Sequence, residues 1–381
     1  MTDFFDVAVI GLGAMGAHTV ADLAARGQKV IGIERFGPLH DRGSSHGDSR
    51  IIRLAYFEDP AYVPLLRRAY EKWAELEARS RETLLIPTGI VQIGERDGVL
   101  IDGVMRASAE HGIPHELLQP AEARKRFPTL VTADDEVAVF EPAGAYLRPE
   151  RAIAVALKLA DADGALLRFN ERVVGFEPKD GGVEVTTQER RYRAGKVIVT
   201  AGSYVAGLVP ELKPYAMPIK QVVGWFDARP AAKAALGSMP VFIVDEGGGM
   251  SFFGFPDLGR GVKIGKHAHL MTGIDPEAPN PPVTAEDREV LADFMRRRMP
   301  GVDPSGNGFV TCRYTMLPES DFLIDFLPGE PRVIVASPCS GHGFKFASVI
   351  GEILADLAIE GATTLPIERL SWAAMTARAG R

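Results

Sequence analysis

The sequence has little cysteine and no long apolar run. Cys312 and Cys339 are its only cysteines in 381 residues, which excludes a disulfide-framed secreted scaffold and a multi-cysteine zinc ribbon. No run approaches the roughly 18 apolar residues of a membrane helix. Acidic Asp3 and Asp6 stand where a signal peptide would carry positive charge. We therefore expect a cytoplasmic protein that does not enter a membrane.

Neither sign of charge dominates the sequence. Lys and Arg number 43 and Asp and Glu number 50, which leaves a formal net charge of −7. Proteins that bind nucleic acid are usually basic, so nucleic acid is not an expected partner. Apolar residues make up 46% and charged residues 24%, which is typical of a globular chain rather than a disordered one. The length is sufficient for two domains of roughly 100–200 residues each.

The first forty residues hold the most informative motif. A short apolar run at 7–10 leads into the turn Gly-Leu-Gly-Ala-Met-Gly at 11–16, and a helical stretch and a second apolar run at 30–33 follow. In such a unit the first glycine permits the tight turn, the second lets a pyrophosphate approach and the third allows close helix–strand packing. Glu34 ends the second run, where it is placed to accept from a ribose hydroxyl. The unit indicates a dinucleotide site rather than a merely tight turn, and it does not choose between NAD and FAD.

The rest of the chain alternates between helical and strand patterns. Helices are predicted at 60–78, 98–111, 120–127, 149–162, 284–299 and up to about 357. Strands are predicted at 90–93, 136–147, 166–200, 219–227, 241–244, 250–255, 261–266 and 332–336. Dinucleotide-type elements therefore lie at both ends and in the middle of the chain, with β-rich segments between them. This order suggests two interleaved domains, which a simple NAD dehydrogenase seldom needs.

Two segments carry cations that a plain core would not hold. In residues 43–53, Arg50 and Arg53 lie on one helical face or at least close together, either in an exposed basic turn or as a guanidinium fork for a carboxylate. In residues 261–267, strand alternation puts Lys263 on one face with His267. If that face is buried, Lys263 needs an anion, a water network or a redox cofactor as its partner. The alternative is an edge strand with solvated charges.

Two more segments combine a reactive side chain with a strand or a turn. Cys312 lies in the β-run 311–315, although most lone cysteines are inert small hydrophobes and Cys339 has no neighbouring charge at all. Residues 340–345 form a glycine-rich turn from a strand to a helix, and this turn carries Lys345. The turn lacks the P-loop spacing, so it resembles a phosphate cradle only loosely, and a solvated lysine is the alternative.

Together these segments resemble the monomeric sarcosine oxidase and N-methyltryptophan oxidase family, FAD enzymes related to D-amino acid and glycine oxidases. The resemblance extends from the glycine turn to the C-terminal helix, and its most specific segments are HGDSRIIR at 46–53, KIGKH at 263–267, TCRYT at 311–315 and SGHGFK at 340–345. It implies an α/β (α+β) fold, in which a Rossmann-like FAD-binding domain is interleaved with an antiparallel-sheet substrate domain. We assign 1–88, 146–218 and 310–381 to the FAD-binding domain and 89–145 and 219–309 to the substrate domain.

The resemblance also implies roles for individual residues, with no metal among them. Cys312 is expected to form a thioether to the flavin, and Lys263 to lie over the flavin face where oxygen is reduced. The expected catalytic residues are Lys263, Arg50 and His267, and the expected substrate-binding residues are Arg53 and Lys345, which hold a carboxylate, with Tyr314 and Phe253. The expected FAD-binding residues are Gly11, Gly13, Ala14, Met15, Gly16, Glu34, Ser44, His46, Ser49, Arg50, Val173, Ala201, Gly202, Cys312, Ser340, Gly341, His342, Gly343 and Lys345.

Several positions depart from the family pattern. Phe253 stands where the family typically has a tyrosine, Leu54 replaces a histidine, Ser49 replaces a threonine, and Pro338-Cys339 precede the turn at 340–345. These changes leave the amine substituent open, while the carboxylate-binding cations and the cysteine are retained.

The function implied is a flavin-dependent oxidase of N-methyl or other secondary amino acids. Oxygen would be the acceptor, and the products would be hydrogen peroxide and an imine that water hydrolyses to an amine and an aldehyde or keto acid. A dehydrogenase of the same architecture that uses a non-oxygen acceptor, and a non-catalytic flavoprotein, are the alternatives. An NAD-linked enzyme is less favoured because it would leave Cys312 unexplained. The expected partners are a small secondary amino acid and oxygen, and we expect a monomer.

Overall fold

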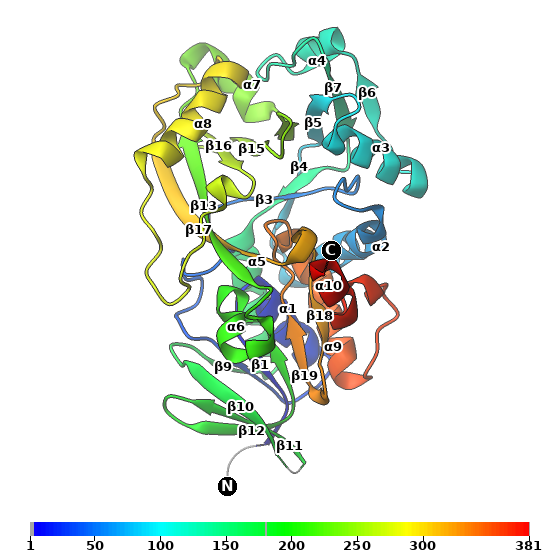
Figure 1. Cartoon of the computed structure of the whole chain (residues 1–381), viewed down its shortest axis with the longest axis vertical. Coiled ribbons are helices and arrows are strands. Elements are labelled where there is room, and N and C mark those ends of the chain that lie inside the picture. Colours follow the sequence, from blue (N-terminus) through cyan, green and yellow to red (C-terminus); the bar gives the residue numbers. More distant parts are fainter. Residues whose placement is uncertain (1–3, 180, 381) are drawn as a thin grey trace.

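The computed structural model describes residues 4–179 and 181–380, with two sheet-containing parts stacked along the long axis of the molecule (Figure 1). The sheet of the lower part contains β1 (Phe4–Ile10), β2 (Val30–Ile33), β9 (Leu166–Arg168), β10 (Val173–Lys179), β11 (Gly182–Thr187), β12 (Arg191–Val199), β18 (Ile324–Leu327) and β19 (Glu330–Ala336). Its parallel core has the order β9–β2–β1–β12–β19, and the remaining strands pair antiparallel at one side. Residues 7–10 are all buried, as expected of a parallel strand covered on both faces.

Three helices cover one face of this sheet. They are α1 (Ala14–Ala25), α5 (Pro149–Ala162) and α9 (Ala347–Ile359), and α1 lies in the middle. Helix α9 approaches α1 closely at Gly351, where an added Cβ would lie 2.8 Å from the backbone of His18. The other face packs against α6 (Val205–Leu208) and α10 (Trp372–Ala379).

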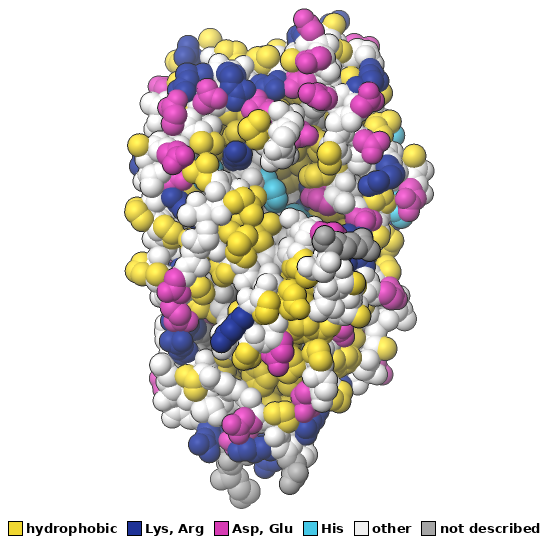
Figure 2. Space-filling view, viewed as in Figure 1, with side chains coloured by type: hydrophobic (Ala, Val, Ile, Leu, Met, Phe, Trp, Pro, Cys, Tyr) yellow, Lys and Arg dark blue, Asp and Glu magenta, His cyan; other side chains and the backbone are white. Residues whose placement is uncertain are grey.

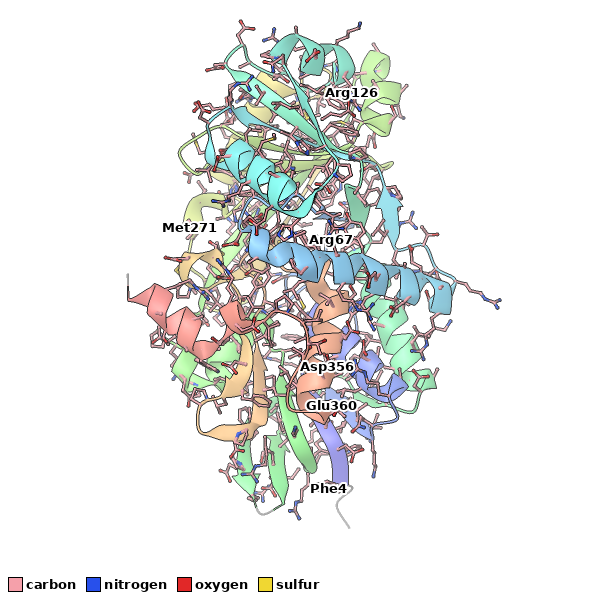
Figure 3. The ribbon with its side chains drawn as sticks, turned by 90° about the vertical axis from the view of Figure 1, so that its right-hand side faces the viewer. Phe4, Arg67, Arg126, Met271, Asp356 and Glu360 are labelled. Carbon is pink, nitrogen blue, oxygen red and sulfur yellow. The ribbon has the colours of Figure 1, made fainter. Side chains whose placement is uncertain are left out.

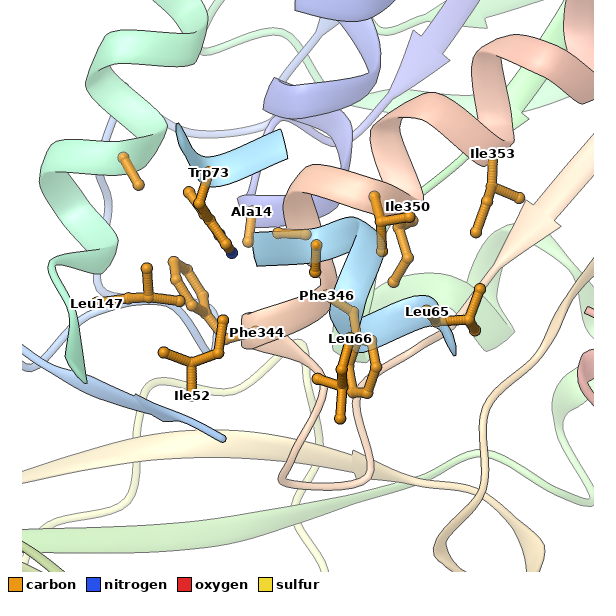
Figure 4. Packing of buried hydrophobic residues seen from close by; sticks show 14 of the residues in the cluster. Ala14, Ile52, Leu65, Leu66, Trp73, Leu147, Phe344, Phe346, Ile350 and Ile353 are labelled. Atoms are coloured by element: carbon orange, nitrogen blue, oxygen red, sulfur yellow. The ribbon is translucent and has the colours of Figure 1, made fainter. Parts of the chain in front are cut away.

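A long helix, α2 (Val63–Ser80), crosses the molecule between the two parts, and Figure 3 shows Arg67 on it. Its wholly buried Trp73 packs among apolar side chains that include Phe344 (Figure 4). The indole Nε1 of Trp73 donates to the carbonyl oxygen of Lys345 at 2.9 Å. This packing fixes the backbone of the glycine-rich turn that the sequence singled out.

The upper part contains a second sheet in the order β17–β13–β16–β15–β14–β5–β7–β6, which is antiparallel except between β14 and β5. Its strands are β5 (Ile90–Glu95), β6 (Glu116–Leu118), β7 (Glu136–Glu141), β13 (Met217–Phe226), β14 (Val241–Asp245), β15 (Ser251–Asp257), β16 (Val262–Lys266) and β17 (Gly308–Met316). Helices α4 (Pro120–Arg126), α7 (Lys233–Ser238) and α8 (Ala285–Arg298) pack on its outer face, and α3 (Val99–His111) packs on the other. The predicted helices at 98–111, 149–162 and 284–299 are thus confirmed.

A small sheet joins the two parts in the order β3–β8–β4, formed by β3 (Arg50–Ile52), β8 (Ala145–Leu147) and β4 (Leu85–Pro87). The expectation that Arg50 and Arg53 share a helical face is wrong, because the segment pairs as a strand with β8. None of the helices within 4–179 and 181–380 is long and apolar enough to cross a lipid bilayer.

The two larger sheets are interleaved along the sequence. The lower sheet takes its strands from 4–33, 166–199 and 324–336, and the upper sheet takes its strands from 90–141, 217–266 and 308–316. Strand β17 straddles the expected boundary at 310 and pairs with β13 along its whole length. The exact residue limits of the two domains stay a prediction.

Candidate active site

A cavity of about 820 Å³ lies between the two large sheets. Strands β1, β2, β12 and β19 all end at it, with Ile10, Ile33, Thr200 and Ala336 in its wall. Ligands of open α/β sheets bind outside the carboxyl ends of the strands, where this cavity lies. Figure 2 shows a hollow between the upper and lower parts, with histidine side chains visible in it.

The glycine turn at 11–16 has the shape of a phosphate-binding turn. An added Cβ at Gly11 would lie 2.6 Å from the carbonyl oxygen of Thr200, and one at Gly16 would lie 1.8 Å from that of Gly11, so both glycines are required by packing. An added Cβ at Gly13 would meet no atom within 4 Å, because Gly13 faces the cavity. Helix α1 begins just after Gly13 without a side-chain cap, so its first N–H groups are directed at the same space. A diphosphate group fits this arrangement.

The carboxylate of Glu34 forms hydrogen bonds with the protein backbone. Its carboxylate accepts from the N–H of Leu12 at 2.8 Å and from that of Phe36 at 3.0 Å, which ties the glycine turn to the end of β2. Glu34 also lines the cavity. Its expected contact with a ribose hydroxyl stays a prediction.

Arg50 shapes the loop that precedes β3. Its guanidinium donates to the carbonyl oxygens of Ser49 at 2.8 Å, Ser44 at 2.6 Å and His46 at 2.7 Å. Arg50 and Arg53 therefore have separate partners, and the expected guanidinium contact to a carboxylate ligand stays a prediction. Burial, with Arg50 beside it, lowers the pKa of His46 to about 4, so this histidine is neutral at the cavity wall.

Lys263 is buried, with 3% of its surface exposed, in a strand between β13 and β15. The alternative of a solvated edge strand is thereby excluded. Its Nζ donates to the carbonyl oxygens of Gly47 and Ser49 and to Ser49 Oγ, and it lies 4.5 Å from the centre of the Phe255 ring. Burial lowers the pKa of Lys263 well below its ordinary value, and the charge of Arg50 acts in the same direction.

Cys312 lies on β17 opposite Gln221 of β13, and its side chain lines the cavity. Burial raises the pKa of the Cys312 thiol, and the nearby cations Arg50 and Lys263 act in the opposite direction. Cys339 lines the same cavity, where its Sγ accepts from the backbone N–H of Thr315 at 3.4 Å.

Arg313, the neighbour of Cys312 in the sequence, points away from the cavity. Its guanidinium donates to Asn280 Oδ1 at 2.8 Å and to the carbonyl oxygens of Pro276 at 2.6 Å and Ala278 at 2.8 Å. It holds the loop before α8 against β17, and it also donates to the hydroxyl of Tyr204 in the lower part at 3.0 Å. The charges that act on Cys312 therefore come from other segments of the chain.

Two buried cations face the cavity where the small sheet meets α9. Arg53, 3% exposed, donates from Nη2 to Glu58 Oε2 at 2.7 Å, and its Nε has no hydrogen-bond partner within the described chain. Lys345 Nζ donates to the carbonyl oxygen of His342 at 2.6 Å. Burial, followed by the charge of Arg53, lowers the pKa of Lys345 to about 7, although Glu58 acts in the opposite direction. Both cations thus retain N–H groups for an anion, which a carboxylate would satisfy.

Aromatic side chains form the wall beside these cations. The rings of His267 and Tyr314 lie 5.7 Å apart, and an added Cβ at Gly341 would overlap both of them. Phe253 lines the cavity as well. Burial lowers the pKa of His267, so its imidazole is neutral.

Most of the predicted site residues meet in this one cavity. Those that line it are Gly11, Gly13, Ala14, Met15, Glu34, Ser44, His46, Arg50, Arg53, Val173, Ala201, Gly202, Phe253, His267, Cys312, Tyr314, Gly341, His342, Gly343 and Lys345. Those that do not line it are Gly16, Ser49, Lys263 and Ser340. Ser340 instead donates to the carbonyl oxygen of Asp321 at 2.7 Å, which supports the turn from outside.

The sequence analysis missed two residues next to the cations. Glu58 lines the cavity, and the ring of Tyr56 lies against both Arg53 and Lys345. Both follow the segment HGDSRIIR at 46–53 within a few positions. Glu58 follows Arg53, a predicted substrate-binding residue, by only five positions in the sequence. This spacing was the sequence feature that could have identified it.

Comparison with known proteins identifies relatives along nearly the whole chain. Residues 6–357 match a family model described as FAD dependent oxidoreductase. The chain is 40% identical over 373 residues to a monomeric sarcosine oxidase of Streptomyces avermitilis, which covers 96% of this chain and 97% of the relative. It is 35% identical over 371 residues to an N-methyl-L-tryptophan oxidase of Yersinia pestis, which covers 97% and 99%.

Solved structures share the same fold. NikD, described as an unusual amino acid oxidase essential for nikkomycin biosynthesis, superposes in its open form with a TM-score of 0.83 at 26% identity, covering 97% of this chain and 98% of its own. The L-proline dehydrogenase of P. horikoshii superposes with a TM-score of 0.82 at 22% identity, covering 100% and 99%. The predicted α/β fold with a Rossmann-like FAD-binding part is thereby confirmed.

Proposed function

This chain belongs to the FAD-dependent oxidoreductase family, and on that basis we propose that it is an FAD-dependent oxidase of N-methyl or other secondary amino acids. The observation that carries the proposal is the pair of buried cations, Arg53 and Lys345, in the same cavity as the glycine turn. The relatives named for sarcosine and N-methyl-L-tryptophan are consistent with this substrate class. Oxygen is the proposed acceptor, hydrogen peroxide the reduced product, and the protein acts as a monomer.

Residues of both parts of the molecule fit FAD. The free N–H groups at the start of α1 and the open space at Gly13 would hold the diphosphate. Cys312 is the proposed covalent attachment point for the flavin ring. When bound, FAD supplies the two-electron oxidation of the substrate's C–N bond, and water then hydrolyses the imine to an amine and an aldehyde or keto acid.

Arg53 and Lys345 bind the carboxylate of the substrate. Arg53 offers its unpartnered Nε and Lys345 offers the Nζ protons that His342 does not use. A hydrogen bond to a charged group contributes about 1.5–3 kcal/mol. Two such contacts orient the Cα–N bond, and orientation of this kind lowers the barrier of the following step.

The amine of the substrate must be uncharged to be oxidised easily. The cations of the carboxylate site disfavour a second positive charge nearby, so they lower the pKa of the bound amine. His267 is neutral because it is buried, so it adds no opposing charge and can accept a proton or a hydrogen bond from the amine. Lys263 is the proposed residue that stabilises negative charge developing on oxygen.

A peroxide-release screen tests the function. The substrates are sarcosine, N-methyltryptophan, N-methylalanine, proline and pipecolate, and each N-methyl amino acid is matched by the amine that lacks its carboxyl group. We expect peroxide from at least one amino acid and little from its matched amine. Flavin bleaching under anaerobic conditions without peroxide in air would instead show a dehydrogenase, and no bleaching by any substrate would contradict the proposal.

A further inference from the structure

Tyr56 lies against both cations of the carboxylate site. The Cζ atom of Arg53 lies 4.8 Å from the centre of its ring, and Nζ of Lys345 lies 5.0 Å from the same centre. Tyr56 is completely buried and does not line the cavity, so it does not meet the substrate itself. It is the aromatic group that the two cations share.

The orientation of this ring is fixed by a chain of hydrogen bonds. His342 Nε2 lies 2.7 Å from the carbonyl oxygen of Ser320, which can only accept, so Nε2 carries the proton. Burial lowers the pKa of His342 to about 3, so the ring is neutral and its Nδ1 accepts. The hydroxyl of Tyr56 therefore donates to Nδ1, and neither Arg53 nor Lys345 donates to its oxygen within the described chain.

The backbone at Tyr56 is also held from outside. Glu141 of β7, which is wholly buried, accepts from the N–H of Leu54 at 2.7 Å and from that of Ala55 at 3.0 Å. The segment between Arg53 and Tyr56 is thus tied to the upper sheet. The backbone on either side of Leu54 and Ala55, which carries Arg53 and Tyr56, is therefore held in place.

Two buried cations that share a site repel each other, and this repulsion contributes to the lowered pKa of Lys345. An additional carboxylate would relieve it, but a carboxylate would also take the N–H groups that the substrate needs and would repel the substrate's own charge. The face of an aromatic ring attracts cations through its quadrupole without accepting their N–H groups in this way. Tyr56 therefore stabilises both cations and leaves their donors free.

We propose that Tyr56 is a positioning residue of the carboxylate site, whose ring holds Arg53 and Lys345 together and charged for a carboxylate ligand. The inference rests on the proposed function insofar as that ligand is the carboxylate of the amino acid. It assigns the effect to the ring and not to the hydroxyl, because both cations lie over the ring and neither donates to the hydroxyl within the described chain.

The experiment reduces the quadrupole moment of the ring at position 56 in steps, while the shape of the ring stays nearly constant. Phenylalanine and its mono-, di- and pentafluorinated analogues are incorporated at position 56, and the dissociation constant of propionate is measured by calorimetry on the FAD-loaded enzyme. We expect Tyr56→Phe to stay close to the parent, and the constant to rise with each fluorination, by about 10-fold at the pentafluoro ring. The same series at Phe322, which packs against His342 at 4.6 Å between ring centres, is the matched control and should be flat.

A second readout separates positioning from folding. In the fluorinated series, KM for the amino acid should rise while kcat at saturation changes little. Because a fluorinated ring attracts cations less, the pKa of Lys345 should fall further. The pH above which binding weakens should therefore move to lower values. The inference would be overturned if the dissociation constant of propionate did not change along the series at position 56, or if it changed equally along the series at Phe322. It would also be overturned if Tyr56→Phe weakened propionate binding as much as the pentafluoro variant. If the parent enzyme oxidises amino acids but propionate binding does not change along the series at position 56, only the inference is refuted. A parent that oxidises none, with a graded propionate series, refutes only the proposed function.

Discussion

Arg53 and Glu58 form an ion pair inside the cavity, with 2.7 Å between Nη2 and Oε2. Burial alone would raise the pKa of Glu58, but the charge of Arg53, together with Lys345 and other neighbouring groups, outweighs it and holds that pKa below its ordinary value. Glu58 is therefore ionised at neutral pH. A substrate carboxylate that binds Arg53 meets a negative charge already in place, so the two carboxylates compete for one guanidinium.

The substitution Glu58→Gln should tighten the binding of simple carboxylates. The glutamine side chain keeps the size of the native one but no longer repels the ligand or holds Arg53 by charge. We expect the dissociation constant of propionate to fall by about tenfold, as measured by calorimetry on the FAD-loaded enzyme. Unchanged or weaker binding would show that Glu58 orients Arg53 for the ligand rather than competing with it.

The charge of Lys345 should set an alkaline limit on substrate binding. Its pKa is lowered to about 7 by burial and by Arg53, so the ammonium is present below that pH and is lost above it. KM for the amino acid should therefore rise above pH 7, by up to about tenfold per pH unit, until binding no longer depends on Lys345.

Two variants of Lys345 test whether the loss of its charge causes the rise of KM above pH 7. Lys345→Arg keeps a permanent positive charge and should remove the alkaline rise of KM, while Lys345→Met should give a high KM at all pH values near neutrality. Arg53→Met should raise KM without removing the pH dependence. An alkaline rise that persists in Lys345→Met would assign it to another group.

The sequence was sufficient to predict features that lie within one continuous segment. It was insufficient to predict hydrogen-bond partners that are far apart in the chain. The glycine turn at 11–16 and the turn at 340–345 were recognised because each is a continuous segment with fixed geometry. The partners of Arg313 were not, since Asn280 lies 33 residues away and belongs to a loop of the upper part. Arg313 points away from Cys312, as alternation along a β-strand requires. The cations that act on Cys312 are Arg50 and Lys263, which come from distant segments of the chain.

The same limit applies to the carboxylate site. Glu141 binds the backbone of Leu54 across 87 residues, and no pattern in either segment reports this contact. Arg53 and Lys345 were identified as a pair only through the family resemblance. The pairing of Arg53 with Glu58 depends on the backbone path after β3, which the expectation that Arg50 and Arg53 lie on one helical face or close together did not describe.

Replacing Lys263 by Met should affect oxygen more than the amino acid. Lys263 is held by carbonyl and hydroxyl oxygens and has no carboxylate partner within hydrogen-bonding distance in residues 4–179 and 181–380. Burial lowers its pKa, and negative charge that develops on a nearby oxygen favours its ammonium form, which in turn stabilises that charge. We expect anaerobic flavin bleaching by substrate to stay near the parent rate and reoxidation in air to slow by orders of magnitude, both followed by stopped-flow absorbance.

Ser49→Ala is the control for the Lys263 experiment. It removes the hydroxyl contact to Lys263 at 3.1 Å and leaves the ammonium and its carbonyl contacts in place. Both half-reactions should therefore stay close to the parent. Equal losses in the two half-reactions of Lys263→Met would make Lys263 a structural residue of the loop at 47–49.

The last prediction concerns the attachment of the flavin, which we assign to Cys312 and not to Cys339. Both thiols line the cavity, but Arg50 and Lys263 act on Cys312 and favour its thiolate, the form that attacks the activated methyl group of the flavin. Burial opposes them by raising the pKa of Cys312, so we expect attachment to the apo-protein to speed up as pH rises. After acid denaturation, the yellow colour should stay with the pellet in the parent and in Cys339→Ala, and pass to the supernatant in Cys312→Ser. Colour that leaves the parent protein would show a non-covalent flavin, and colour retained by Cys312→Ser but lost in Cys339→Ala would move the attachment to the other thiol.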